Sequence, residues 1–175
     1  MSLILGKDGI QKLMVGYPTV SDKYNVGPAV NCGEDPIYPG DAVFSEDAEG
    51  HGFYVNVSEA ESGFTFVGFA VATNVNVPMT YPAPEGPVPF APGQAFGLLK
   101  SGYIAVEVAS AGAYAGVKEG APIYLMQSGK VAPGHGSEDA LLIPGYFTGV
   151  KEMHGSTPVA EIFVPYTTTE AVRGE

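Results

Sequence analysis

Short apolar runs, separated by clusters of Gly, Pro, Asn and Ser, recur along the chain. Runs of this length, rich in Val, Ile, Phe and Tyr and bounded by turn-forming residues, are typical of β-strands. The strongest is 64–73, where the aromatic side chains at 64 and 66 fall on one face because side chains alternate along a strand. Gly68 lies inside this run and predicts a bulge or a close backbone approach. Other predicted strands are 53–57, 122–126, 141–143, 146–150 and 159–164.

Two places in the second half of the chain have the pattern of a β-hairpin. Residues 94–99 and 103–108 are mostly apolar, and Lys100-Ser101-Gly102 between them resembles a turn. In the same way, Pro144-Gly145 separates 141–143 from 146–150 and predicts that these two strands pair.

Helical patterns are weak. Only 8–15 and 109–118 are candidates, and Gly112 and Gly116 favour a loop or a single helical turn in the second. We therefore predict an all-β fold, a compact β-sandwich or small barrel of about eight short strands.

Two segments differ from the rest of the chain. Residues 78–92 hold six prolines in 15 positions, and because proline has no N–H, this predicts an extended loop and excludes a central strand. The loop either packs on its own domain or clamps a neighbouring subunit. Residues 1–36 show weak periodicity and predict an extended N-terminal arm with one or two short strands. The division is then an arm (1–36), a β domain (37–166) and a C-terminal tail (167–175).

The charge of the chain limits its partners. Its 175 residues carry a net charge of −11, and no Lys or Arg occurs between Lys23 and Lys100. No basic patch suggests binding to nucleic acid or to an anionic membrane. The acidic surface either provides solubility or matches a basic partner. No apolar stretch is long enough to span a membrane, no signal peptide is recognised, and the single cysteine fits synthesis in a reducing cytoplasm.

The sequence contains no motif for catalysis or for cofactor binding. Phosphate-binding, nucleophile-elbow and metal-ligand motifs are missing from it. His51, His135 and His154 lie far apart in turn-like contexts, without the spacing of zinc ligands. Cys32 has acidic neighbours, which disfavour a reactive thiolate, so we expect it to be buried. We predict no catalytic, metal or cofactor residues, and no enzymatic activity.

In the order of its strands the chain resembles the structural cement proteins of tailed bacteriophages, also called head decoration proteins. The resemblance covers roughly residues 10–166 and rests on the order and spacing of several segments. These are Gly40-Asp41-Ala42-Val43-Phe44, Phe66-Val67-Gly68-Phe69-Ala70, the glycine-containing run 92–106, Gly120-Ala121-Pro122-Ile123-Tyr124 with Gly129-Lys130, and Gly149-Val150 with 159–163. The proline-rich insert at 78–92 is longer than the family pattern.

The resemblance implies a non-enzymatic protein of the virion, made in the host cytoplasm and located on the outer surface of the capsid. Such proteins bridge neighbouring major capsid proteins, usually as homotrimers, although dimers exist. It implies no cofactor, no nucleic acid and no membrane as partner. The candidate residues for the contacts with other copies and with the capsid are Leu3, Ile4, Leu5, Met79, Tyr81, Pro82, Pro84, Pro87, Val88 and Phe90.

Two other interpretations remain open. A tail tube or baseplate β domain shares this composition, but it should polymerise on its own. A small ligand-binding β-barrel is the second alternative. Of the known types, a cupin needs clustered histidines and a lipocalin-like barrel needs longer, regularly alternating strands.

Overall fold

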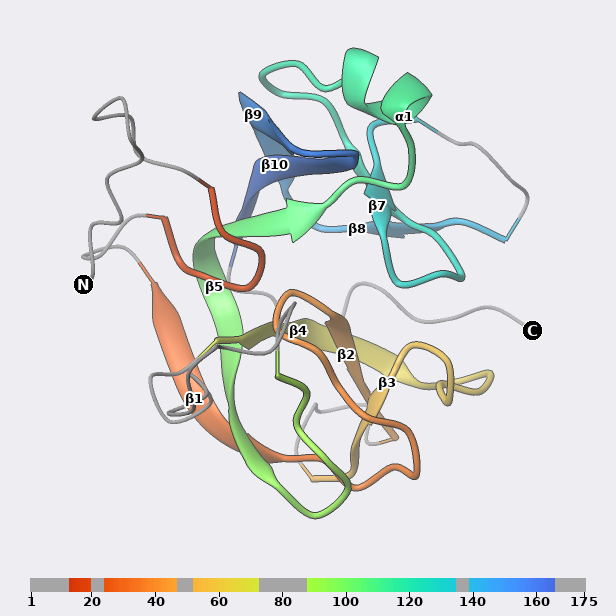
Figure 1. Cartoon of the computed structure of the whole chain (residues 1–175). Helices are drawn as coiled ribbons and strands as arrows, with labels where there is room; N and C mark the ends of the chain where they lie inside the picture. Colours follow the sequence, from red (N-terminus) through yellow and green to blue (C-terminus); the bar gives the residue numbers. More distant parts are fainter. Residues whose placement is uncertain (1–12, 20–23, 47–51, 73–87, 135–138, 166–175) are drawn as a thin grey trace.

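The structure, a computed structural model, describes residues 13–19, 24–46, 52–72, 88–134 and 139–165 (Figure 1). Within these ranges it contains one short helix and ten strands, which confirms the predicted all-β class. The elements are β1 Asn25–Val30, β2 Ala42–Ser45, β3 Tyr54–Asn56, β4 Thr65–Val71, β5 Ala95–Glu107, α1 Ala111–Ala115, β6 Ile123–Leu125, β7 Val131–Ala132, β8 Leu141–Ile143, β9 Tyr146–His154 and β10 Thr157–Val164.

The strands form two antiparallel sheets. The larger has the order β3-β2-β4-β5-β10-β9, and β1 also pairs with β5. The smaller has the order β7-β6-β8. Figure 1 shows β5 passing from the lower part of the molecule, with β1 to β4, to the upper part, with β6 to β10.

The hairpin predicted at 94–108 is wrong, because β5 continues through Lys100-Ser101-Gly102 as one strand of 13 residues. Its first part pairs with β1 and β4, and its second part pairs with β10. Gly102 has φ of +129°, a conformation that favours glycine, and it lies opposite Val164 in the ladder. The glycine therefore marks an irregular point inside a strand whose two ends have partners, and no turn forms there.

The pairing predicted around Pro144-Gly145 is also wrong, although both strands exist. β8 pairs with β6, whereas β9 pairs with β10, so Pro144-Gly145 connects the two sheets.

In the segment 109–118, where a loop or a single helical turn was expected, one short helix, α1, forms. Its N-cap is Ser110, whose hydroxyl accepts a hydrogen bond from the Ala113 N–H at 3.1 Å.

Five strands curve into a small barrel. The first part of β5 with β1, β4, β2 and β3 forms a continuous surface, and a parallel bridge between Asn31 and Tyr54 joins its two ends. Buried side chains from four of these strands fill it, together with Ile37 and Phe90. We call residues 24–46, 52–72 and 88–99 the barrel half, and residues 100–134 and 139–165 the second half.

A larger core unites the two halves. It includes Phe44, Phe66 and Phe69 from the barrel half and side chains of β5, β6, β8, β9 and β10 from the second half. The three phenylalanines make edge-to-face contacts, with ring centroids 6.0 Å and 5.4 Å apart. This core therefore holds the two halves together, beside the smaller core inside the barrel.

The described part of the predicted N-terminal arm belongs to this fold, so residue 36 does not mark a break in the packing. Leu13 is buried against Ala105 and Val159, and the Gly16 N–H donates to the Ala105 carbonyl at 2.8 Å. β1 is a strand of the larger sheet. Residues 1–12 of the predicted arm lie outside the described residues.

Gly68 has the role predicted for it. The register between β2 and β4 shifts beside Gly68, its φ is +149°, and a Cβ atom there would overlap the Leu99 carbonyl oxygen. We expect Gly68→Ala to lower the free energy of unfolding by about 2–3 kcal/mol, because the neighbouring backbone has to move. Gly120→Ala is the control, since Gly120 also has positive φ but has open space at the Cβ position. It should lose about 1 kcal/mol, and equal losses in urea titrations would contradict this role of Gly68.

Candidate interaction surfaces

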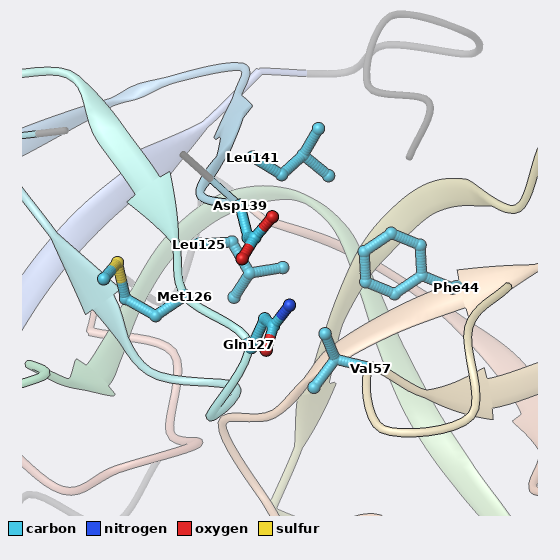
Figure 2. A pocket seen from close by; sticks show the side chains of 7 residues that line it. All are labelled: Phe44, Val57, Leu125, Met126, Gln127, Asp139 and Leu141. Atoms are coloured by element: carbon cyan, nitrogen blue, oxygen red, sulfur yellow. The ribbon is translucent and has the colours of Figure 1, made fainter. Parts of the chain in front are cut away.

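Figure 2 shows a hollow between the two halves of the molecule. Phe44 and Val57 line one side, and Leu125, Met126, Gln127, Asp139 and Leu141 line the other. Its volume is about 10 Å³, which is room for roughly one water molecule. This hollow is therefore too small to bind an organic substrate.

The structure also describes some of the residues that the sequence analysis considered as metal ligands or as a nucleophile. Among the described residues, no three His, Cys, Asp or Glu side chains lie close enough together to hold a metal ion. His154 has its Nε2 atom 3.3 Å from a carboxylate oxygen of Glu152, while His51 and His135 lie outside the described residues. Cys32 is exposed, so the expectation that it is buried is wrong; its thiol points back to the Val30 carbonyl at 3.3 Å.

Eight of the ten predicted contact residues lie outside the described residues, namely Leu3, Ile4, Leu5, Met79, Tyr81, Pro82, Pro84 and Pro87. Val88 is half-buried. Phe90 is fully buried, and its ring packs on Phe96 with centroids 5.3 Å apart.

Phe90 is therefore a core residue and is not available as a surface contact. Its backbone explains this position, because the N–H and carbonyl of Phe90 exchange hydrogen bonds of 2.7 Å and 3.1 Å with Ile37. The bridge fixes the end of the proline-rich run inside the barrel half.

Asn31, which the sequence did not single out, closes the barrel. It is completely buried, and its amide nitrogen donates to the carbonyls of Asp35 and Phe90 at 2.9 Å and 3.0 Å. Its side-chain oxygen accepts from the Gly33 N–H at 3.0 Å. One side chain thus connects the end of β1, the following loop and the Phe90 segment.

Asp41 lies at the entrance to β2 and is also largely buried. One of its carboxylate oxygens accepts from the Tyr38 N–H at 2.9 Å and from the Asn56 amide at 3.1 Å. Burial raises the pKa of the Asp41 carboxyl to about 6, against the lowering effect of these two hydrogen bonds.

We expect Asp41→Asn to be about 1–3 kcal/mol more stable than the wild-type chain at pH 7. The folded-state pKa lies above the unfolded value of 3.8, so the folded protein binds the proton more tightly and Asp41 reduces stability as pH rises from about 4 to about 6. Asparagine removes the titration, and its single oxygen can accept both hydrogen bonds. Urea titrations at several pH values check this; an unchanged decline in the variant would contradict it.

Exposed large apolar side chains occur in both halves. In the barrel half they are Tyr24, Val26, Val30, Tyr38 and Phe53, and in the second half Leu142, Tyr146, Val150 and Met153. Tyr103, Phe163 and Tyr146 also stack across β5, β10 and β9, with centroids 4.8 Å and 5.3 Å apart.

The two halves differ more clearly in their charged residues than in their exposed apolar side chains. The barrel half has six described acidic residues and no Lys or Arg. They are Glu34, Asp35, Asp41, Glu46, Glu59 and Glu61. The second half has four lysines and five acidic residues. The acidic residues of the barrel half therefore outnumber the basic side chains beside them, of which Lys100 lies against Gly27 in β1.

A comparison with protein families finds a match over residues 7–163 to the family described as structural cement protein (E217 gp24/Pam3 gp6). The match spans most of the chain. This chain belongs to the phage structural cement protein family. Membership gives it a structural role in a phage virion and implies association with capsid proteins.

A search of curated proteins finds no match. In the part of the chain that the structure describes, no helix is long and apolar enough to cross a membrane.

Proposed function

We propose that this protein binds the outer surface of the phage capsid and bridges neighbouring major capsid proteins, without enzymatic activity, so that the shell is stabilised. The family match over residues 7–163 carries this proposal. Two features support it. The two halves of the all-β fold share a buried core, and the hollow between them holds only about one water molecule. Repeated over a lattice, many modest contacts give high avidity.

The experiment uses empty, expanded shells assembled from the major capsid protein of the phage that encodes this chain. Purified protein is mixed with the shells and sedimented, and the bound fraction is measured against concentration. Saturable binding that raises the temperature at which the shells rupture supports bridging. Binding without any change in rupture temperature contradicts bridging.

We further propose that the protein forms a homotrimer and that residues 78–88 and Leu3-Ile4-Leu5 contribute to its contacts with other copies and with the shell. The proline-rich run can lie across a neighbour with little extra ordering cost. A dimer is the alternative and would preserve the cement function with a different geometry.

Tyr81→Ser is expected to weaken the trimer about tenfold, because a central aromatic side chain in an interface often dominates its affinity. Light scattering during chromatography measures the mass over a dilution series. Leu142→Ser is the matched control, since Leu142 is 54% exposed on β8 and its loss should leave the mass unchanged. A Tyr81 variant that dissociates like the wild-type protein shows that this loop is not the interface.

A further inference from the structure

The second part of strand β9 has an open edge in the described structure. β9 is an end strand of the larger sheet and pairs with β10. Near its start the other side is occupied, because Phe147 exchanges hydrogen bonds of 2.9 Å with Gly120 and Ala121. From residue 151 to residue 153, no described strand or loop forms backbone hydrogen bonds with that side. We call Lys151-Glu152-Met153 the β9 edge.

The register shows which backbone groups of the β9 edge point outward. The Pro158 carbonyl of β10 accepts from the Val108 N–H at 2.9 Å and therefore faces β5. Met153 lies opposite Pro158, so its own N–H and carbonyl point away from β10. Backbone groups alternate along a strand, and Lys151, two residues earlier, has the same direction as Met153. Both residues therefore offer an N–H and a carbonyl to a partner strand.

Exposed apolar side chains accompany these backbone groups. Val150 is 51% exposed and Met153 is 42% exposed, although both belong to a strand of the sheet. A strand added at the β9 edge would cover them, so the edge offers hydrophobic contact as well as hydrogen bonds. Natural sheets usually cover or block such an edge, because it invites pairing with another chain.

The N-terminal segment of the chain begins beside the same edge. Leu13, the first described residue, donates its N–H to the Glu152 carboxylate at 2.9 Å. Residues 1–12 precede it and contain the apolar run Leu3-Ile4-Leu5. Twelve residues span at most about 40 Å, which is enough to reach a neighbouring copy. Each copy thus has a segment and an edge at one place, and copies that meet there can exchange segments in a closed ring.

We propose that the β9 edge of one copy accepts Leu3-Ile4-Leu5 of a neighbouring copy as an added strand. The inference rests on the proposed function, because it takes the proposed contacts between copies as given. It adds the site at which Leu3-Ile4-Leu5 bind and the mode of their binding.

The first test compares two substitutions at Met153, with the mass measured by light scattering over a dilution series. Met153→Pro removes an outward N–H and no hydrogen bond to β10. It should weaken association about tenfold, while the circular dichroism and the melting temperature stay close to wild type. Met153→Ala removes the same side chain but keeps the N–H, and should weaken association about threefold or less.

The second test removes the other partner. A chain without residues 2–6 should associate about tenfold more weakly than the wild-type chain, like Met153→Pro. Combining the two changes should weaken association little further, because each removes the same contact.

A peptide provides a test that does not depend on the folding of Met153→Pro. A synthetic peptide of residues 1–12, added in excess to the wild-type protein, should compete for the β9 edge and lower the mass of the oligomer. The matched control is the same peptide with Leu3→Ser, Ile4→Ser and Leu5→Ser, which should leave the mass unchanged. Equal effects of the two peptides would contradict the inference.

Other results would also overturn it. If the wild-type chain is an oligomer and Met153→Pro associates as tightly as Met153→Ala, the edge is not used and the proposed oligomer stands. If the losses from Met153→Pro and from the truncation add, the segment and the edge bind at separate places. If the truncation lowers the melting temperature and leaves the mass unchanged, the edge holds the segment of its own chain. If the Met153 variants weaken binding to empty shells and leave the mass unchanged, the occupant belongs to the capsid protein. A wild-type chain that is monomeric at every concentration shows that the proposed homotrimer itself fails.

Discussion

Phe90→Ala is expected to lower the free energy of unfolding by about 3–5 kcal/mol. The ring has no exposed surface, and it packs on Phe96 inside the barrel half with Ile37, Val43 and Leu98. Truncation leaves a cavity among side chains that belong to several strands, so the gap cannot easily collapse. This loss is a large fraction of the free energy of unfolding of an ordinary domain.

Urea titrations followed by circular dichroism measure this loss. Val88→Ala is the control, because Val88 is only half-buried in the same segment, and it should lose about 1 kcal/mol. A Phe90 variant that is as stable as the wild-type chain but defective in shell binding would return Phe90 to the contact surface and contradict its place in the core.

Asn31→Asp should destabilise the fold at pH 7 by about 3–5 kcal/mol. The amide nitrogen of Asn31 lies 2.9 Å and 3.0 Å from two carbonyl oxygens, and aspartate would place a carboxylate oxygen there. The substitution removes two donors and buries a charge against two acceptors. Because a protonated aspartate can donate one hydrogen bond, the loss should become smaller as the pH falls.

The matched control is Asn25→Asp, at the exposed start of β1. It makes the same chemical change in contact with water and should alter stability by less than about 0.5 kcal/mol. The measurement is chemical unfolding at pH 7 and at pH 4. Equal losses for the two variants would show that Asn31 does not close the barrel.

The alternation of apolar and turn-forming residues was enough to predict the fold class and most strands. Gly68 could also be interpreted, because a glycine inside an apolar run has few explanations. Pairing was harder to predict. The segment 100–102 resembles a hairpin turn, but whether a strand stops there depends on partners elsewhere in the chain, and β1, β4 and β10 supply partners on both sides of it.

The candidate site was less predictable, for a related physical reason. Phe90 lies in a proline-rich run that resembles a surface loop, and only its bridge to Ile37 places it in the core. Asn31 gave no signal, because a buried amide is recognised only when the carbonyls around it are known. The uneven charge is visible in the sequence, whereas the gathering of the acidic residues in one half of the fold depends on how the strands pair.

The central claim is that this protein binds the outside of a phage shell and holds its subunits together. The most direct test is sedimentation of the wild-type chain with expanded empty shells, followed by measurement of bound copies per shell and of the rupture temperature. We expect saturation at a fixed number of copies, with shells that rupture at a higher temperature than bare ones. Protein that stays in the supernatant at every concentration, or polymerises without shells, would contradict the claim.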